Sequence, residues 1–319
     1  MKNILVLIPA EERHKEKLEA AGNGCSFTYA SMDTVTDEQL DRASVIIGNV
    51  LPPERLQARP QLELLQLESA GADDYCRPGV LSLGTVLANS TGVYGKAVAE
   101  HCFITALMLQ KKLELYRDNQ NKHLWKDCGK VTSISDSTVL VVGLGDIGLH
   151  FARMAKALGA HTIGLKRRQS SCPEGIDELC LTAQLDEVLP RADIIASFLP
   201  NTPETTHIYT AERFEKMKRT AVFINGGRGT AVSSEVLYRA LTDGKISAAG
   251  VDVTEIEPLP ADSPLWDLPN LMITPHISGG YHLRETFERI VDIAADNIRA
   301  WNEGKPIGNQ VDFATGYKK

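Results

Sequence analysis

The chain has 319 residues with a formal net charge of −7, 43% hydrophobic residues and 24% charged residues, a length at which two domains are expected. It lacks the long basic runs of nucleic-acid partners and the roughly 20 consecutive apolar residues of a membrane span. Its six cysteines show neither a C-x-x-C pair nor cysteine-histidine spacing suited to zinc, so we expect a soluble, cytoplasmic protein with reduced thiols and no metal site.

The first third of the chain alternates short apolar runs with amphipathic stretches. Strands are predicted at 4–8, 44–48, 64–68 and 85–88. Because helical patterns separate the earlier runs, these strands are expected to form one doubly wound parallel sheet. Residues 96–116 follow, with apolar positions at helical spacing, and predict a long buried helix that leads into a second unit.

A second series of apolar runs predicts another parallel sheet. Its strands are expected at 138–142, 162–165, 193–198, 221–225, 246–251 and 271–273. After the last of them, residues 283–301 have the apolar spacing of a helix that returns the chain to the first sheet. We therefore predict an α/β protein with two doubly wound parallel-sheet domains: a discontinuous one of residues 1–97 and 286–319, and an inserted one of residues 98–285.

A glycine-rich turn follows the first strand of the second series. Residues 143–148 read G-L-G-D-I-G and lead from a strand into a helical pattern, the context that a dinucleotide-binding turn requires. Gly143 would allow the tight turn, Gly145 the approach of a pyrophosphate and Gly148 close packing of helix on strand. The helix N-terminus would add amide donors for the phosphates. A turn without a ligand and the cofactor turn of a methyltransferase are the alternatives.

Three basic residues lie where this kind of fold recognises the adenosine ribose of the cofactor. NAD enzymes place an acidic side chain about 20 residues beyond the turn, whereas NADP enzymes need cations for the 2′-phosphate. At that distance from Gly148 the chain has Lys166, followed by Arg167 and Arg168. We therefore predict that NADP is preferred and that NAD is possible; a solvated basic turn that tolerates either cofactor is the alternative.

Three further segments each end a predicted strand and carry a polar group suited to 2-oxo acid chemistry. Arg228 offers a planar, bidentate donor for a carboxylate. His276 can donate a proton near neutral pH to a carbonyl oxygen that gains negative charge as hydride arrives at carbon. Glu257 can favour the imidazolium form and orient the ring. Since parallel strands end at one edge of a sheet, the three are expected to converge, although each alone could be an ordinary structural residue.

These segments resemble the signatures of the D-isomer-specific 2-hydroxyacid dehydrogenases. The similar motifs are G-L-G-D-I-G at 143–148, L-P-N-T-P-E-T at 199–205, N-G-G-R-G at 225–229, D-V-T-E-I-E-P at 252–258, T-P-H-I at 274–277, and the segments 89–92 and 97–100 that resemble the family's entry to its interdomain helix. The sequence departs from the family at Lys111 and Lys112, where many relatives carry arginine, and at Gly226 and Gly227, which replace a commoner apolar or small pair. Neither departure removes a member of the catalytic triad.

The resemblance implies a flavodoxin-like substrate domain, a Rossmann cofactor domain and an active site in the cleft between them. It implies that Arg228 binds the substrate, that His276 is the acid in reduction and the base in oxidation, and that Glu257 tunes His276. The residues implied to contact the cofactor, besides the three glycines and the basic cluster, are Asp146, Ile147, Leu199, Pro200, Thr205, Gly226, Gly279 and, at the nicotinamide carboxamide, Asp252. The residues implied to contact the substrate, besides Arg228, are Ala70, Gly71 and Tyr94.

The implied activity is hydride transfer between NAD(P)H and a small 2-oxo acid, which gives the D-2-hydroxy acid. A homodimer formed through the region 113–127 is a further family expectation, with neither nucleic acid nor membrane as a partner. The alternative within the superfamily is a nucleotide-sensing regulatory binding protein, which would not need a proton donor. The side chain of the substrate is not legible, so glyoxylate, hydroxypyruvate, pyruvate and bulkier 2-oxo acids stay open.

Overall fold

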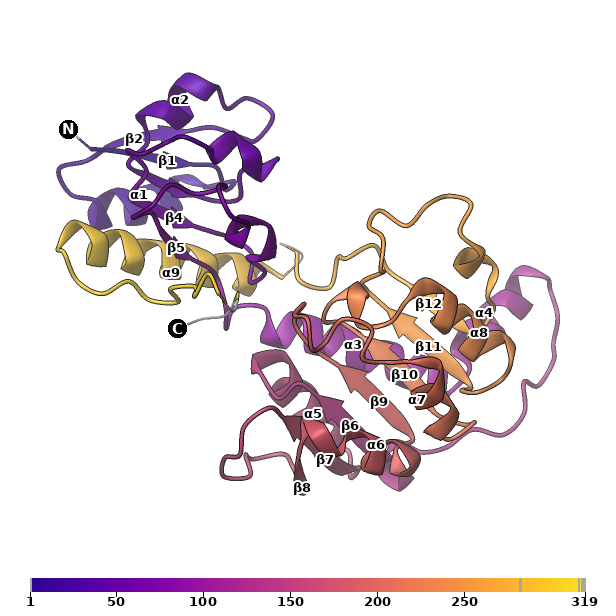
Figure 1. Ribbon diagram of the computed structural model, residues 1–319. Coiled ribbons are helices and arrows are strands. Elements are labelled where there is room, and N and C mark those ends of the chain that lie inside the picture. Colours follow the sequence, from indigo (N-terminus) through magenta and orange to yellow (C-terminus); the bar gives the residue numbers. More distant parts are fainter. Residues whose placement is uncertain (1, 281–282, 315, 317–319) are drawn as a thin grey trace. The chain divides into compact units, whose positions relative to one another are not determined.

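The computed structural model describes residues 2–280, 283–314 and 316. Two compact units make up the chain, and each has its own sheet (Figure 1). The smaller unit runs to Tyr94 and includes the segment after Gly280, and the larger unit is Gly95–Gly280. From the sequence, the chain is expected to cross between domains at 97/98 and 285/286.

The smaller unit is a five-stranded parallel sheet with helices on both faces. Its strands are β1 Asn3–Val6, β2 Ser26–Tyr29, β3 Val45–Ile47, β4 Leu64–Gln66 and β5 Val86–Ala88, in the order β2-β1-β3-β4-β5. Its helices are α1 Glu12–Ala21, α2 Asp37–Arg42, η1 Pro53–Leu56, η2 Asp73–Cys76 and α9 Arg284–Asn302. The C-terminal helix α9 packs beside α1 on one face, where Ile290, Val291 and Ile298 are buried. This strand order is that of flavodoxin-like folds.

The larger unit is a seven-stranded parallel sheet. Its strands are β6 Thr138–Val142, β7 His161–Lys166, β8 Glu178–Leu181, β9 Ile194–Ser197, β10 Val222–Asn225, β11 Ala248–Val251 and β12 Leu271–Ile273. Its helices are α3 Gly95–Gln110, α4 Leu113–Asn121, η3 Ile134–Asp136, α5 Asp146–Ala157, η4 Thr182–Gln184, α6 Leu185–Val188, η5 Leu189–Arg191, α7 Ala211–Lys216, η6 Gly229–Ala231, α8 Ser234–Thr242 and η7 Pro264–Asp267. The strand order β12-β11-β10-β9-β6-β7-β8 turns back between β6 and β9, which is the Rossmann arrangement.

The central strands of the larger unit are buried on both faces, as expected for a parallel sheet covered by helices. Helices α3 and α5 pack together on one face, where the rings of Phe103 and Phe151 meet edge to face with centroids 5.3 Å apart. On the other face Phe214 and Phe223 form a second edge-to-face pair inside the main core. The strand ends from which the functional loops leave are therefore supported by a packed core on each side.

The predicted α/β class with two doubly wound parallel sheets is confirmed. The sequence does not predict the edge strands β2 and β8, because β2 is only half-buried along its length and β8 has a single buried residue, so neither contains a continuous apolar run. The prediction of one helix over 96–116 is wrong, since Lys112 adopts a left-handed φ of 57° and separates α3 from α4. The amines of Lys111 and Lys112 donate to the carbonyls of Thr132 and Cys128, at 2.6 and 2.7 Å, and so tether the segment that follows α4.

None of the described helices combines the length and the apolar character needed to cross a bilayer. Within the described part of the chain, no group of three or more histidine, cysteine, aspartate or glutamate side chains is placed to hold a metal ion. All six cysteines are free thiols, and only Cys172 is exposed.

Candidate active site

The loops of the larger unit that carry the predicted site residues leave the same edge of one sheet. They follow β6, β7, β9, β10, β11 and β12, and all of these strands are parallel. The carboxyl edge of such a sheet is where ligands bind in doubly wound folds. The glycine turn and the basic residues follow β6 and β7, whereas the three catalytic candidates follow β10, β11 and β12.

The turn after β6 has the shape that its glycines allow. Gly143 has a φ of 97°, and a Cβ there would lie 2.8 Å from the carbonyl oxygen of Phe198. A Cβ at Gly148 would collide with the carbonyl group of Gly143, so α5 begins directly against the strand end. A Cβ at Gly145, by contrast, would meet no other atom within 4 Å. The first turn of α5 thus has open space in front of it, and its amides fit a pyrophosphate.

Asp146 and Ile147 are the first and second residues of α5. The Asp146 carboxylate lies 3.6 Å from Nε2 of His150, one helical turn along. It also packs against Gly95, at the start of α3, where any Cβ would collide with it. A carboxylate at a helix N-terminus is favoured by the helix dipole, so Asp146 stabilises the start of α5 as well as bordering the turn.

The loop after β9 is closed by its own threonines. The hydroxyl of Thr205 donates to the carbonyl oxygen of Pro200 at 2.6 Å, and it accepts the amide of Thr202 at 2.9 Å. Leu199, the residue before Pro200, is buried. These contacts give the loop a fixed shape beside the glycine turn, because Gly143 contacts the backbone that precedes Leu199.

Close packing explains the two glycines that depart from the family pattern. A Cβ at Gly226 would lie 2.5 Å from Sγ of Cys102 on α3. A Cβ at Gly227 would lie 2.5 Å from the carbonyl oxygen of Leu199. The loop after β10 is therefore wedged between α3 and the loop after β9, and larger residues would displace it.

The basic cluster lies at the end of β7. Lys166 is the last residue of the strand, and Arg167 and Arg168 follow it with exposed side chains. The Lys166 amine lies 3.3 Å from Oγ of Ser170. The pKa of Glu204, in the loop after β9, is lowered mainly by a hydrogen bond from its own backbone amide and least by the charge of Arg167. Segment 166–170 contains no acidic residue.

Arg228 lies in the turn after β10, which the buried Asn225 braces. The Asn225 side chain donates to the carbonyl oxygen of Arg228 at 3.0 Å and accepts the amide of Gly227 at 3.2 Å. The guanidinium group donates to the Gly227 carbonyl at 3.1 Å. A Cβ at Gly229 would collide with the carbonyl of Thr254, so this turn packs directly on the loop after β11.

His276 and Glu257 form a hydrogen-bonded pair. Nδ1 of His276 lies 2.8 Å from Oε2 of Glu257, whose other oxygen accepts the amide of Thr254 at 3.0 Å. The hydrogen bond with Glu257 raises the pKa of His276, against the smaller effects of burial and of the Arg228 charge. Burial raises the pKa of Glu257, but its hydrogen bonds with His276 and Thr254 outweigh burial and the net pKa is lowered. The imidazolium is thereby favoured, and Nε2 is the nitrogen that faces away from Glu257.

Asp252, the residue after β11, holds the loop that carries His276. Its side chain is buried, and its carbonyl oxygen accepts the amide of His276 at 2.8 Å. Oδ1 accepts the Thr274 hydroxyl at 2.6 Å and the Ile277 amide at 3.0 Å. Oδ2 accepts the amide and the hydroxyl of Ser278 at 3.1 and 2.5 Å. A carboxylate has about four lone-pair sites, so a nicotinamide carboxamide would have to replace one of these donors.

Gly279 follows Ser278 in the next turn, which a hydrogen bond from the Gly280 amide to the Ile277 carbonyl closes at 3.3 Å. Its position is partly buried. The predicted cofactor residue after β12 therefore shares one short loop with His276.

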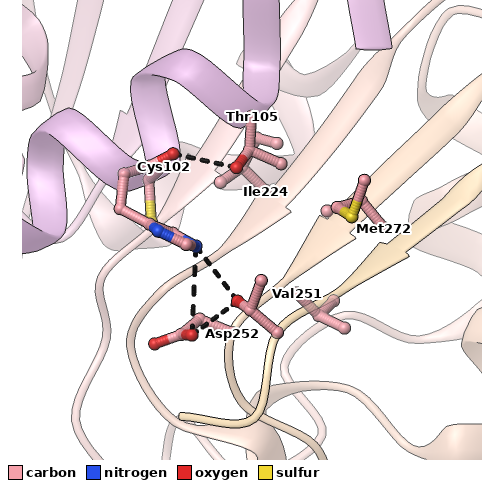
Figure 2. Close-up of a pocket in the computed structure, with 9 residues that line it drawn as sticks. Cys102, Thr105, Ile224, Val251, Asp252 and Met272 are labelled. Atoms are coloured by element: carbon pink, nitrogen blue, oxygen red, sulfur yellow. Dashed lines mark hydrogen bonds and ion pairs between the residues drawn. The ribbon is translucent and has the colours of Figure 1, made fainter. Parts of the chain in front are cut away.

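A small pocket lies beside Asp252, between α3 and the strand ends (Figure 2). Cys102 and Thr105 of α3 line it on one side and Asp252 on the other. His101, also on α3, lines the pocket and places Nε2 3.0 Å from Oγ1 of Thr274. Sequence reasoning missed His101 because the helix was interpreted only as an apolar, buried element. The signal was present, since a histidine interrupts that apolar pattern.

The predicted substrate residues of the smaller unit lie in two places. Ala70 and Gly71 are in the loop after β4, and Tyr94 is the last residue before the chain enters the larger unit. The Asn89 side chain donates to the carbonyl of Ala70 at 2.7 Å, which orders the loop. Among residues 2–280, 283–314 and 316, the amides of Ala70 and Gly71 donate no hydrogen bond, as a backbone site for an anion requires. The Tyr94 hydroxyl donates to the Glu68 carbonyl at 2.5 Å, so this tyrosine is tied to the same loop.

A known family matches most of the larger unit. The family model described as D-isomer specific 2-hydroxyacid dehydrogenase, NAD binding domain, matches residues 103–278. Among curated proteins, the glyoxylate/hydroxypyruvate reductase B of Citrobacter koseri is 33% identical over 262 residues, which cover 81% of this chain and 80% of the relative. The similarity thus extends beyond the segment that the family model covers.

Two solved structures are similar over nearly the whole chain. A D-isomer specific 2-hydroxyacid dehydrogenase family protein from Aeromonas salmonicida has a TM-score of 0.85 and 32% identity, and the match covers 98% of this chain and 99% of that one. An NADPH-dependent glyoxylate/hydroxypyruvate reductase from Sinorhizobium meliloti, solved with NADP and sulfate, has a TM-score of 0.83 and 26% identity over 99% of this chain and 100% of that one. Both likenesses include the smaller unit.

Proposed function

Because this chain belongs to the D-isomer-specific 2-hydroxyacid dehydrogenase family and is an NAD(P)-dependent enzyme of that family, we propose that it reduces a small 2-oxo acid to the D-2-hydroxy acid. The observation that carries the proposal is the pair of His276 and Glu257, 2.8 Å apart, at the sheet edge that also bears Arg228. A proton donor and a cation for a carboxylate are the groups that such a reduction needs.

Arg228 is proposed to bind the substrate through its carboxylate and carbonyl oxygens. Its guanidinium is planar and offers paired donors, which match a carboxylate better than an ammonium group does. The amides of Ala70 and Gly71 are proposed as further donors to the same carboxylate, and Tyr94 as a further substrate contact. Asn225 supports the role of Arg228, since it braces the turn from which the guanidinium projects.

His276 is proposed to be the general acid in reduction and the general base in oxidation. When bound, the reduced nicotinamide supplies the hydride that the carbonyl carbon receives. The C=O double bond becomes a single bond, and the oxygen takes a proton from Nε2 of His276. The 2-oxo acid thus gains one hydride and one proton, and His276 is left neutral. Glu257 stabilises the imidazolium before this transfer and holds the ring by Nδ1.

The dinucleotide is proposed to bind along the loops after β6, β7, β9, β10, β11 and β12. The residues proposed to hold it are Gly143, Gly145, Asp146, Ile147, Gly148, Lys166, Arg167, Arg168, Leu199, Pro200, Thr205, Gly226, Asp252 and Gly279. The open space at Gly145 and the first turn of α5 support a pyrophosphate at that point. For Asp252, a carboxamide would take the place of one of its four present donors.

Glyoxylate and hydroxypyruvate are the substrates we expect first, because the relatives from Citrobacter koseri and Sinorhizobium meliloti are named as reductases of these acids. The test is a panel of 2-oxo acids from glyoxylate to phenylpyruvate, assayed with NADPH and with NADH. We expect the highest kcat/KM for a small acid, and D-glycerate as the product from hydroxypyruvate. A wild-type protein that reduces none of these acids, or that yields the L-isomer, would refute the proposal.

We further propose that NADP(H) is preferred over NAD(H). The cations at the end of β7 can form charge-assisted hydrogen bonds to a 2′-phosphate, and segment 166–170 has no carboxylate to repel it. The double substitution Arg167→Ala with Arg168→Ala should raise the KM for NADPH far more than that for NADH. Equal effects on the two cofactors, or a higher kcat/KM with NADH in the wild type, would contradict this preference.

A homodimer formed through 113–127 is also proposed. Helix α4 buries none of its residues, and Leu113, Leu124 and Trp125 expose 52%, 52% and 106% of their surfaces. Several exposed large apolar side chains in one short segment are consistent with an interface. Sedimentation should show that the wild type is a dimer and that the double variant Leu124→Ser with Trp125→Ser is a monomer. A monomeric wild type would overturn the proposed dimer. A cytoplasmic location stays a prediction.

A further inference from the structure

We propose that His101, on α3, is a positioning residue for His276 and acts through Thr274 and Asp252. The inference rests on the proposed function only in that His276 is taken as the proton donor. A chain of hydrogen bonds within the larger unit runs from His101 on α3 to the loop that carries His276.

The direction of each hydrogen bond follows from the chemistry of the partners. An ionised carboxylate only accepts, so the Thr274 hydroxyl, 2.6 Å from Oδ1 of Asp252, gives its single proton to Asp252. The same hydroxyl oxygen lies 3.0 Å from Nε2 of His101 and must therefore accept there. His101 thus carries a proton on Nε2, whichever form its other nitrogen takes. The order of donation is His101 to Thr274 to Asp252.

The receiving carboxylate holds the residues on either side of His276. Asp252 accepts from Thr274 before it and from Ile277 and Ser278 after it, and its carbonyl accepts from the His276 amide. His276 itself has a φ of 52°, a left-handed conformation that a residue with a side chain adopts at a cost in free energy. Such a backbone persists where surrounding contacts hold it. The position of the imidazole against Glu257 consequently depends on this set of hydrogen bonds.

His101 contributes the contact that comes from another element. Asp252 follows β11 and Thr274 follows β12, whereas α3 packs across β10 and β11. The imidazole borders the pocket of Figure 2 and is 26% exposed, so close packing alone does not fix its orientation. The hydrogen bond to Thr274 fixes the orientation of the ring. Through it, the loop that carries the proton donor is tied to a helix that is buried against the sheet.

Loss of the His101 donor should loosen the contact between His276 and Glu257. Three charged groups act on the His276 ring: Glu257 and Asp252 favour the imidazolium, and Arg228 opposes it. If Glu257 is less well placed, the pKa of His276 falls toward its ordinary value. Reduction requires the imidazolium, so its alkaline limb would move to lower pH. We expect the turnover to fall about tenfold, a part of the roughly 10²–10⁴-fold that general acid catalysis supplies.

The experiment compares His101→Leu, which removes the donor, with His101→Gln, which keeps an N–H donor. Thr274→Val removes the hydroxyl that joins His101 to Asp252, and its control Thr274→Ser keeps a hydroxyl there. We expect His101→Leu and Thr274→Val to lower the kcat of reduction and to shift its alkaline limb to lower pH, and the losses should not be additive in the double variant. His101→Gln and Thr274→Ser should recover most of the wild-type behaviour. Equal losses in the Leu and Gln variants, or an unshifted pH profile in the Leu variant, would overturn the proposal.

A nitrogen-15 NMR titration of the histidine rings in the cofactor-free protein separates this inference from the proposed function. His276→Gln assigns the His276 signal, and the ring pKa is then compared between wild type and His101→Leu. A lower pKa in the variant and a proton on Nε2 of wild-type His101 support the inference even if no 2-oxo acid is reduced. An unchanged His276 titration, or His101 protonated on Nδ1 alone, rejects it even in a fully active enzyme.

Discussion

The turn after β6 and the loop after β12 leave the same edge of one sheet, yet different forces hold them in place. The first is set by the backbone: Gly143 and Gly148 permit a close approach that any side chain would block. The second is set by side chains from distant segments, with Asp252, Glu257 and His101 all contributing to the loop around His276. A site for phosphate needs donors with fixed direction, whereas a site for proton transfer needs a tuned pKa.

The largest effect should come from His276, the proposed proton donor. His276→Gln removes the proposed general acid, so the turnover with the best 2-oxo acid should fall by roughly 10²–10⁴-fold. Because the glycine turn does not depend on this loop, the Kd for the cofactor should stay close to that of the wild type. Steady-state kinetics and a fluorescence titration of the cofactor measure the two quantities. Near-normal turnover would remove His276 from this role.

The next effect concerns Arg228, the proposed anchor of the substrate carboxylate. Arg228→Lys keeps the charge but replaces a two-pronged donor with a point charge, and a lost charge-assisted hydrogen bond costs about 1.5–3 kcal/mol. We therefore expect kcat/KM for the 2-oxo acid to fall by about 10- to 100-fold. The KM for cofactor serves as the control and should change little. Wild-type kinetics in this variant would mean that another group binds the carboxylate.

Two alanine substitutions test the glycine turn after β6 separately from the loop after β12. A Cβ at Gly145 meets open space, so Gly145→Ala should fold normally and raise the cofactor Kd by about tenfold, because the methyl group occupies the path of the pyrophosphate.

At Gly148 the Cβ collides with backbone, so Gly148→Ala should lower the Tm, in line with about 1–3 kcal/mol for overpacking. Thermal denaturation and cofactor titration of both variants provide the measurement. Cofactor affinity unaffected in Gly145→Ala would argue against a dinucleotide at this turn.

The smallest effect is a shift in pH dependence. The hydrogen bond with Glu257 raises the pKa of His276, so the imidazolium persists above the ordinary histidine range and the reduction rate should decline only as the pH passes that raised pKa. Glu257→Gln removes the negative partner, lowers the pKa and should move the decline to lower pH. Profiles of kcat against pH for the two proteins give the comparison. Superimposable profiles would show that Glu257 does not tune the donor.

Strands that are buried on both faces could be predicted from the sequence. The bounds of β6 agree with the apolar run 138–142, since a central strand of a parallel sheet covered on both faces needs continuous apolar sequence. The edge strands β2 and β8 escaped prediction because their sequences, S-F-T-Y and E-L-C-L, include polar residues and are mostly not buried. The other two edge strands, β5 and β12, have the apolar sequences V-L-A and L-M-I, and the sequence predicts both.

The break at Lys112 was missed for another reason. Lysine seldom adopts a positive φ, and this one does so with its amine held by the carbonyl of Cys128.

What the sequence determined by itself was the local chemistry. A contiguous run of six residues, 143–148, contains all that a phosphate-binding turn requires, and the identities of Arg228, Glu257 and His276 are the basis of the proposed reduction. The tertiary structure alone decided how those groups are held. His101 and Thr274 are 173 positions apart, and Asp252 joins them only because β11 and β12 pair beneath α3. Hydrogen bonds between side chains so distant depend on the packing of the whole unit, which no local pattern records.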